Sequence, residues 1–226
     1  MIAVVTGAGR GIGRACAIEL ARRGADVALL ARTKKELDEA AARVRDEGCR
    51  ALVVECDVTD ANAVAKAAER VLEELGAPDV VVANAGVVRR ALVSEMDESD
   101  WDLVVDVNLK GAFLAARAFV PAMVEKKRGR YVAIGSISST LGTPRQSAYC
   151  AAKWGTVGFV KSLAEELRGS GVQALVVLPG SVDTDMLRGS GFEARMSPED
   201  VAKVVAFASL DAPDAMNGSA VEMFGP

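Results

Sequence analysis

The first twenty residues, MIAVVTGAGRGIGRACAIEL, contain a short apolar run that leads directly into a glycine-rich segment, Thr6–Gly13. The run Ile2–Val5 is apolar and short, as buried strands are, and a helical pattern begins at Gly13. Glycines allow a tight turn, and they let bare backbone approach a phosphate at a helix N-terminus, where amide donors and the helix dipole favour negative charge. The segment lacks the G-x-x-x-x-G-K-[ST] pattern of a P-loop. The sequence therefore predicts a nucleotide-phosphate turn between the first strand and first helix of a βαβ unit.

Further apolar runs of strand length follow, and longer helical segments separate them. The runs are continuously apolar, as in strands that are covered on both faces. With Ile2–Val5, the expected strands are Val27–Leu30, Ala51–Val54, Val80–Ala83, Tyr131–Ile134, Ala174–Leu178 and Ala220–Phe224. The expected helices are Gly13–Arg23, Lys34–Glu47, Ala61–Leu75, Trp101–Glu125 and Ala148–Arg168. This alternation predicts an α/β fold: a single doubly wound Rossmann-type domain over residues 1–226, with a seven-stranded parallel sheet and helices on both faces.

Capping residues indicate several helix boundaries. Asp60 is a predicted N-cap, and Ser197 is a second N-cap, followed by Pro198 at the first helical position. Four glycines stand where helices are expected to end and turn into the next strand: Gly48, Gly76, Gly129 and Gly171.

The composition excludes several classes of function. The 226 residues include 27 Lys or Arg, 31 Asp or Glu and no His, which gives a net charge of −4. Without histidine, Ser-His-Asp catalysis, Cys-His catalysis and HExxH zinc sites are excluded. The net charge gives no reason to expect nucleic acid or a membrane surface as a partner.

The cysteines and the hydropathy indicate the cellular environment. The four cysteines, Cys16, Cys49, Cys56 and Cys150, show no C-x-x-C spacing, and we interpret them as small buried residues in a reducing compartment. No uninterrupted apolar stretch is long enough for a transmembrane helix. We expect a cytoplasmic protein with no metal site.

The end of the second expected strand indicates which dinucleotide binds. A nicotinamide dinucleotide site normally has an acidic residue here, which binds the adenosine ribose hydroxyls. The segment VALLART (residues 27–33) has no carboxylate, and Arg32 follows the strand directly. A guanidinium suits a 2′-phosphate, and Arg10 of the glycine-rich turn can lie beside the same group. Two arginines and the missing acid favour NADP(H) over NAD(H); the alternative is that Arg32 is a solvated loop residue.

Tyr149 and Lys153 stand four residues apart in SAYCAAK (residues 147–153), which places both side chains on one face of a helix. A tyrosine with a pKa of about 10 is a poor base at neutral pH, but an adjacent ammonium stabilises its phenolate. The pair can therefore perform acid–base chemistry in a chain without histidine. Alone, such a pair is usually an incidental surface contact, so it gains weight only from other motifs.

Taken together, the motifs resemble those of the classical short-chain dehydrogenase/reductase family, including its 3-oxoacyl-[acyl-carrier-protein] reductases. The matching positions run through essentially the whole chain: Thr6-Gly7-x-x-x-Gly11-Ile12-Gly13, Asn84-Ala85-Gly86, Asn108, Ser136 and Tyr149-x-x-x-Lys153. Ser136 precedes Tyr149 by thirteen positions, the usual interval of the family, which favours it over Ser138 and Ser139. The segment PGSVDT (residues 179–184) is similar to the family's segment beside the nicotinamide.

The resemblance implies a catalytic set of Asn108, Ser136, Tyr149 and Lys153. Tyr149 would donate a proton to a carbonyl oxygen during reduction, or remove one from an alcohol during oxidation. Lys153 would lower the pKa of Tyr149 and hydrogen-bond the nicotinamide ribose. Ser136 would hold the substrate oxygen where charge develops. Asn108 would hold a water that links Lys153 to solvent; the alternative is an amide that satisfies backbone groups in a kinked helix.

The resemblance also implies the cofactor contacts. Asp57 would contact the adenine, although an Asp at a strand end is often only a helix cap. Val182 and Thr184 would meet the carboxamide, and Asn84 and Gly86 would line the cofactor site. The full expected set is Gly7, Gly9, Arg10, Gly11, Ile12, Gly13, Arg32, Asp57, Val58, Asn84, Ala85, Gly86, Tyr149, Lys153, Pro179, Gly180, Val182 and Thr184.

The sequence says less about the substrate. Asp185–Met196 leaves about a dozen residues for the substrate loop, which is short for the family and predicts an open mouth. Several arginines fall on loops expected near this mouth, although loop arginines are mostly solvated: Arg89, Arg90, Arg145 and Arg188. The run Lys126–Arg130 resembles the patch where 3-oxoacyl-[acyl-carrier-protein] reductases receive their acidic carrier; the alternative is a helix C-terminus that favours cations.

We therefore expect an NADPH-dependent carbonyl reductase that acts on a ketone or a 3-oxoacyl thioester, with an acyl carrier as a second partner. The short substrate loop and the ending Met223–Pro226 depart from the carrier-protein reductases. An NADP-linked alcohol, polyol or steroid dehydrogenase is the enzymatic alternative, and a non-catalytic dinucleotide-binding sensor is the alternative from another class. The segments Trp101–Glu125 and Ala148–Arg168 resemble the helices of the family's interfaces, which predicts a homodimer or homotetramer.

Overall fold

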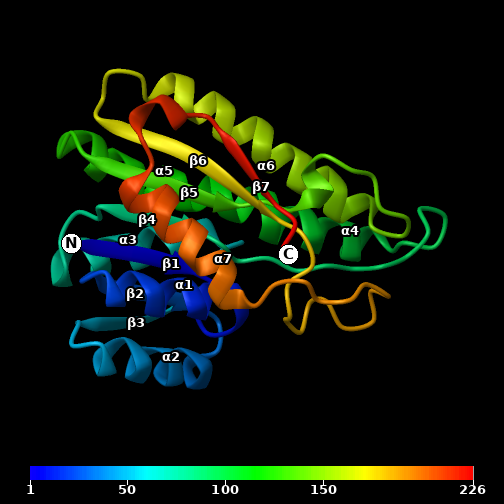
Figure 1. Cartoon of the computed structure of the whole chain (residues 1–226), viewed down its shortest axis with the longest axis horizontal. Coiled ribbons are helices and arrows are strands. Elements are labelled where there is room, and N and C mark those ends of the chain that lie inside the picture. The colour runs from blue at the N-terminus through cyan, green and yellow to red at the C-terminus, as the bar shows by residue number, and fades with distance from the viewer. Residues whose placement is uncertain (226) are drawn as a thin grey trace.

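The structure, a computed structural model, describes residues 1–225 and contains one parallel sheet. Its seven strands lie in the order β3-β2-β1-β4-β5-β6-β7, and every neighbouring pair is parallel (Figure 1). This arrangement confirms the predicted fold class. The strands are β1 (Ile2–Thr6), β2 (Asp26–Ala31), β3 (Ala51–Glu55), β4 (Val80–Ala83), β5 (Gly129–Ile134), β6 (Val172–Pro179) and β7 (Ala220–Met223).

Helices cover both faces of the sheet because successive strand residues point to opposite sides. Val4 belongs to one buried cluster, whereas its neighbours Ala3 and Val5 belong to the other. One cluster packs under α1 (Gly11–Arg22), α2 (Lys34–Asp46) and α7 (Pro198–Ala206). The other packs under α3 (Ala61–Glu74), α5 (Gly111–Glu125) and α6 (Ser147–Glu166).

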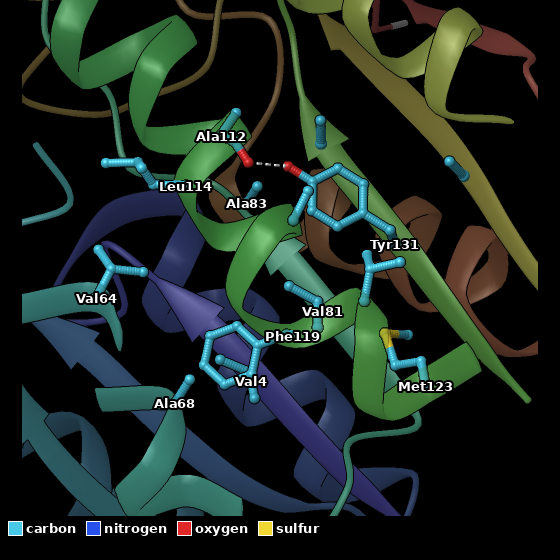
Figure 2. Close-up of a cluster of buried hydrophobic side chains, with 14 of the residues drawn as sticks. Val4, Val64, Ala68, Val81, Ala83, Ala112, Leu114, Phe119, Met123 and Tyr131 are labelled. Carbon is cyan, nitrogen blue, oxygen red and sulfur yellow. Dashed lines mark hydrogen bonds between the residues drawn. The ribbon is translucent and has the colours of Figure 1, made fainter. Parts of the chain in front are cut away.

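Figure 2 shows the second of these clusters, where aromatic and aliphatic side chains fill the space between α5 and the sheet. Phe119 and Met123 of α5 lie over Val4 and Val81, and all four are fully buried. The hydroxyl of Tyr131 donates a hydrogen bond of 2.7 Å to the carbonyl of Ala112 at the start of α5. Strand β5 is thus tied to α5 by a polar contact inside an apolar core.

The predicted N-caps are confirmed. The carboxylate of Asp60 accepts hydrogen bonds from the backbone of Asn62 and Ala63, and Ser197 forms a reciprocal capping box with Asp200. Such caps satisfy amide groups that have no partner within the helix.

Two predicted boundaries are wrong. Gly129 does not end a helix: it is the first residue of β5, and a Cβ there would lie 2.3 Å from Cε of Met123. The left-handed residue after α5 is Lys127, with φ of 55°. The expected helix Trp101–Glu125 is instead α4 (Glu98–Val105), a π-helical turn (Asp106–Lys110) and α5 in succession.

The interpretation of the cysteines is wrong in part. Cys16 and Cys56 are buried, but Cys49 and Cys150 are half-buried, and all four are free thiols. Within residues 1–225 no helix is long and apolar enough to span a membrane, and no cluster of potential metal ligands occurs.

Replacing Tyr131 by Phe should lower the free energy of unfolding by about 1 kcal/mol, because the Ala112 carbonyl loses a buried donor. Denaturant unfolding of the two proteins measures the difference. An unchanged midpoint would show that this hydrogen bond does not stabilise the fold.

Candidate active site

The candidate site begins where β1 and β4 end side by side. The Oγ1 atom of Thr6 accepts hydrogen bonds from the backbone N–H of Asn84 (3.0 Å) and of Ala85 (3.1 Å). The Asn84 side-chain amide donates in return to the carbonyls of Thr6 (2.9 Å) and Gly7 (3.3 Å). The strand order of the sheet reverses between β1 and β4. In open α/β sheets, ligands bind at such a reversal, at the carboxyl ends of the strands.

The glycine-rich turn lies against this junction without room for side chains. Gly7 has φ of +65°, and a Cβ on Gly13 would lie 2.2 Å from the carbonyl oxygen of Gly7. Helix α1 begins within the turn at Gly11, and within the described chain its N-cap residue Arg10 makes no side-chain capping hydrogen bond. The first amides of α1 are therefore unoccupied donors, which suits a phosphate group.

The next strand ends place Arg32 beside Asp57. Arg32 follows β2, Asp57 follows β3, and the two side chains approach to 3.9 Å (Nη1 to Oδ2). Partial burial acts to raise the pKa of Asp57, but hydrogen bonds from the Thr59 backbone and hydroxyl, with the Arg32 charge, outweigh it and lower the pKa. Asp57 is therefore a well-fixed carboxylate, and the neighbouring guanidinium is largely exposed, with 63% side-chain accessibility.

Sequence reasoning missed Glu36, which lies against the glycine-rich turn. A Cβ on Gly9 would lie 2.8 Å from Cβ and 3.2 Å from Oε2 of Glu36. Glu36 stands in the first turn of α2, five residues after the end of β2, so inspection of the strand end did not find it. The end of β2 itself carries no carboxylate, as the sequence indicates, and Glu36 brings one to the glycine-rich turn from α2.

Tyr149 and Ser136 meet at the next strand end. Ser136 follows β5 and caps a 3-10 turn, where its Oγ accepts from the backbone N–H of Ser138 at 3.1 Å. Burial raises the pKa of Tyr149, which lies in the first turn of α6, and the Ser136 hydroxyl is close enough to oppose that rise. Because the Ser136 oxygen already accepts a backbone hydrogen bond, its O–H can donate to Tyr149 or to a substrate oxygen.

Lys153 is buried one helical turn beyond Tyr149. Its Nζ donates a 2.7 Å hydrogen bond to the carbonyl of Ile134 and lies 5.6 Å from the centre of the Tyr149 ring. Desolvation lowers the pKa of Lys153 to about 8. The structure thus brings Lys153 to Tyr149, but the net pKa of Tyr149 is raised, and the lowering expected from Lys153 is not seen.

Asn108 occupies the π-helical turn between α4 and α5. Its Nδ2 donates to the carbonyls of Val87 (2.7 Å) and Val104 (2.8 Å), which matches the alternative of an amide that satisfies backbone groups. Its Oδ1 is buried and has no hydrogen-bond partner among the described residues. A Cβ on Gly86 would lie 2.8 Å from this oxygen. Asn108 therefore has a fixed donor and a free acceptor, to which a water could donate.

The segment after β6 closes over the glycine-rich turn. Gly180 is fixed by its N–H to the Met223 carbonyl (2.8 Å), and Val182 pairs with Met196 across the substrate loop. A Cβ on Gly11 would lie 3.4 Å from the methyl carbon of Thr184. The residues expected at the phosphates and at the carboxamide therefore lie together at the carboxyl ends of the strands.

Two basic features behave differently from the expectations. Arg10 pairs with Asp185 of the substrate loop at 3.1 Å, rather than turning towards the Arg32 site. In the run Lys126–Arg130, the cations Lys126 and Arg128 pair with Asp79, at 2.6 Å and 3.7 Å. Arg130 is mostly buried, and its Nη2 donates a hydrogen bond to the carbonyl of Ala212. The run also lies at the start of β5, at the amino ends of the strands, whereas Tyr149 lies at their carboxyl ends.

These features fit a dinucleotide. The uncapped start of α1 offers donors, and the Oδ1 of Asn108 offers an acceptor, that have no partner within the described chain. The glycines of the turn allow the backbone to pack closely at the start of α1. The fold and the site define a dinucleotide-binding oxidoreductase with a Ser–Tyr–Lys constellation.

Comparison with known proteins assigns the family. The family model for short chain dehydrogenases matches residues 1–193. A 3-oxoacyl-[acyl-carrier-protein] reductase from Synechocystis sp. is 36% identical over 220 residues, which cover 93% of this chain and 89% of the relative. The corresponding Escherichia coli reductase, FabG, is 35% identical over 237 residues, 99% of this chain and 96% of the relative. The chain belongs to the short-chain dehydrogenase/reductase family, which confirms the resemblance.

A solved structure agrees with this assignment. The alcohol dehydrogenase of the archaeon Thermococcus sibiricus, crystallised with 5-hydroxy-NADP, superposes with a TM-score of 0.88 at 29% identity. The match covers 99% of this chain and 94% of that one.

Burial of Lys153 should make the stability of the ligand-free protein depend on pH. The folded-state pKa of about 8 lies below the ordinary value of 10.5, so between these values the unfolded chain binds more protons and stability rises with pH. The stabilisation by Lys153→Met should therefore be larger at pH 7 than at pH 10, by up to about 3 kcal/mol.

Denaturant unfolding at the two pH values measures this difference. Lys161→Met removes an exposed lysine from the same helix and is the control, for which no such change is expected. A pH-independent effect of Lys153→Met would show that folding does not lower the pKa of Lys153.

Proposed function

We propose that this short-chain dehydrogenase/reductase is an NADPH-dependent carbonyl reductase with Tyr149 as the proton donor. The observation that carries the proposal is the buried cluster of Ser136, Tyr149 and Lys153 beside a glycine-rich dinucleotide turn. A dinucleotide sensor without catalysis has no use for a buried proton donor with two positioned neighbours. The cluster therefore favours an enzyme over the sensor.

The roles of the residues follow from their contacts. Ser136 holds the substrate oxygen with its free O–H, and Tyr149 donates its proton to that oxygen as the carbonyl is reduced. The bound dinucleotide supplies the hydride. Lys153, fixed by Ile134, stabilises the tyrosinate that remains, and Asn108 holds the water through which the proton is replaced from solvent. The raised pKa of Tyr149 keeps the proton in place at neutral pH, which suits reduction better than oxidation.

The preference for NADP(H) rests on Arg32. Its exposed guanidinium lies beside the fixed carboxylate of Asp57, so a 2′-phosphate could bind Arg32 while Asp57 contacts the adenosine. The relative crystallised with 5-hydroxy-NADP agrees with this preference. Gly7, Gly9, Gly11, Ile12 and Gly13 form the proposed pyrophosphate turn. The remaining proposed contacts are Arg10, Val58, Asn84, Ala85, Gly86, Pro179, Gly180, Val182 and Thr184.

The names of the curated relatives support 3-oxoacyl thioesters as one substrate class, with an acyl carrier as the partner that presents them. The basic run Lys126–Arg130 adds no support for a carrier, because Asp79 and Asp214 form ion pairs with three of its four cations. An NADP-linked alcohol, polyol or steroid dehydrogenase remains the second candidate. We also propose self-association through α4, α5 and α6, where Trp101, Phe113 and Trp154 are exposed.

Tyr149→Phe should abolish NADPH-dependent reduction of ketones while NADPH binding persists, because the ring remains and only the proton donor is lost. NADPH oxidation followed by absorbance, with cofactor binding followed by fluorescence, separates the two effects. Tyr131→Phe is the matched control: it removes the other tyrosine hydroxyl of the chain, within the core under α5, and should retain turnover. Undiminished activity in Tyr149→Phe would overturn the assignment.

Arg32→Asp should weaken NADPH binding by about 100-fold and NADH binding far less, because a charged hydrogen bond to the 2′-phosphate becomes a repulsion. Titration of each cofactor gives the two dissociation constants. Arg43→Asp makes the same change of charge at an exposed position of α2 and is the control. Equal losses of affinity for both cofactors would place the 2′-phosphate elsewhere. Tighter binding of NADH by the variant would show that residue 32 contacts the adenosine ribose.

A further inference from the structure

Arg90 lies on the loop that leaves β4, and two hydrogen bonds fix its position. The backbone N–H of Ala91 donates to the carbonyl of Arg145 (3.0 Å), in the loop that leads into the helix of Tyr149. The Nη2 of Arg90 donates to the carbonyl of Met186 (2.9 Å), in the substrate loop. Arg90 thus spans the space between the residues before Tyr149 and the loop expected over the substrate.

The guanidinium of Arg90 has no acidic partner among residues 1–225. Its Nε is buried and makes no hydrogen bond within the described chain, and no carboxylate forms a salt bridge with it. The preceding residue behaves in the ordinary way: Arg89 is exposed, and its Nε pairs with Asp100 at 3.0 Å. A half-buried cation with an unused donor is costly, so its position beside the candidate site points to an anion that residues 1–225 do not supply.

The surroundings of Arg90 are those of a substrate site. Tyr149 is buried in a small apolar cluster with Val104 and Ala148, and the side chains packed on that cluster include Val88 and Met186. Burial raises the pKa of the Tyr149 hydroxyl, and the positive charge of Arg90 acts against that rise. In addition to Lys153, a second cation therefore acts on the proton donor, close to the apolar side chains of this cluster.

We propose that Arg90 binds the carboxylate of the substrate, and that the substrate is an oxo acid whose ketone oxygen meets Ser136 and Tyr149. This inference rests on the proposed carbonyl reduction at the same site and specifies its substrate class. A carboxylate accepts two N–H groups of the guanidinium side by side and cancels its charge. The carbonyl of a thioester accepts a hydrogen bond but leaves the charge unneutralised, so the unpaired cation favours the acid.

The test compares each acid with its neutral ester. Acetoacetate and methyl acetoacetate, and 4-oxopentanoate with its methyl ester, place a ketone at two distances from the charge. The wild-type protein should show a higher kcat/KM with the acid in at least one pair. Arg90→Met should lower kcat/KM for that acid by about 10- to 100-fold, the loss of a charged hydrogen-bonded contact.

The ester isolates this effect from damage to the substrate loop. Arg90→Met also loses the hydrogen bond to Met186, and any loosening of the loop lowers activity with the acid and the ester alike. The ratio of the two kcat/KM values therefore reports the charge contact alone. Arg90→Lys keeps the charge without the planar fork and should recover part of the ratio, whereas Arg89→Met is the matched control and should leave it unchanged.

The outcomes separate this inference from the proposed function. Turnover with the esters in wild-type protein, together with an acid-to-ester ratio that Arg90→Met leaves unchanged, would overturn the role of Arg90 and keep the carbonyl reductase. If no ketone is turned over, the proposed function fails, and calorimetric titration of acetoacetate into the NADPH-loaded protein still tests Arg90. Binding that Arg90→Met abolishes would support the anion site, and an absence of binding to wild-type protein would refute it.

Discussion

The structure depends on the contact between two stretches of backbone at the ends of β1 and β4. Gly13 lies so close to the carbonyl of Gly7 that no side chain fits between them, and the Asn84 amide occupies the adjoining space with hydrogen bonds to both Thr6 and Gly7. This contact sets where α1 begins, and therefore where its free amides point. It also fixes the start of the loop that carries Gly86 and Arg90. The phosphate end and the substrate end of the site are thus positioned by the same junction.

The second constraint is the cost of acid–base chemistry without histidine. The chain relies on a tyrosine and a lysine, and both are buried, so desolvation raises the pKa of one and lowers that of the other. Both pKa shifts disfavour the charged forms of the two side chains, the Tyr149 phenolate and the Lys153 ammonium. Ile134 and Ser136, on either side of the end of β5, hold Lys153 and Tyr149 by backbone and hydroxyl contacts that work in either protonation state. The sheet therefore provides positions, whereas burial provides the proton affinity.

The sequence predicted the fold well because its signals are local. Continuous apolar runs locate every strand to within about two residues, and Asp60 and Ser197 carry their caps in their own side chains. The failures concern contacts that no local pattern encodes. Gly129 is required by the side chain of Met123, not by a helix end, and Glu36 reaches the glycine-rich turn because α2 starts beside it. Likewise, no local pattern reveals that Arg10 pairs with Asp185, 175 positions away.

The charge of Arg90, with which no carboxylate of residues 1–225 forms a salt bridge, and the buried hydroxyl of Tyr149 are linked by electrostatics. Burial raises the pKa of Tyr149, and the guanidinium of Arg90 acts against that larger effect. A carboxylate bound to Arg90 would cancel that pull in a region from which the apolar neighbours exclude water, where charges interact strongly. The hydroxyl would then hold its proton more firmly in the complex with an oxo acid than in the free protein. Binding of the substrate anion would in this way keep Tyr149 protonated until the carbonyl oxygen gains charge, which is the state that reduction requires.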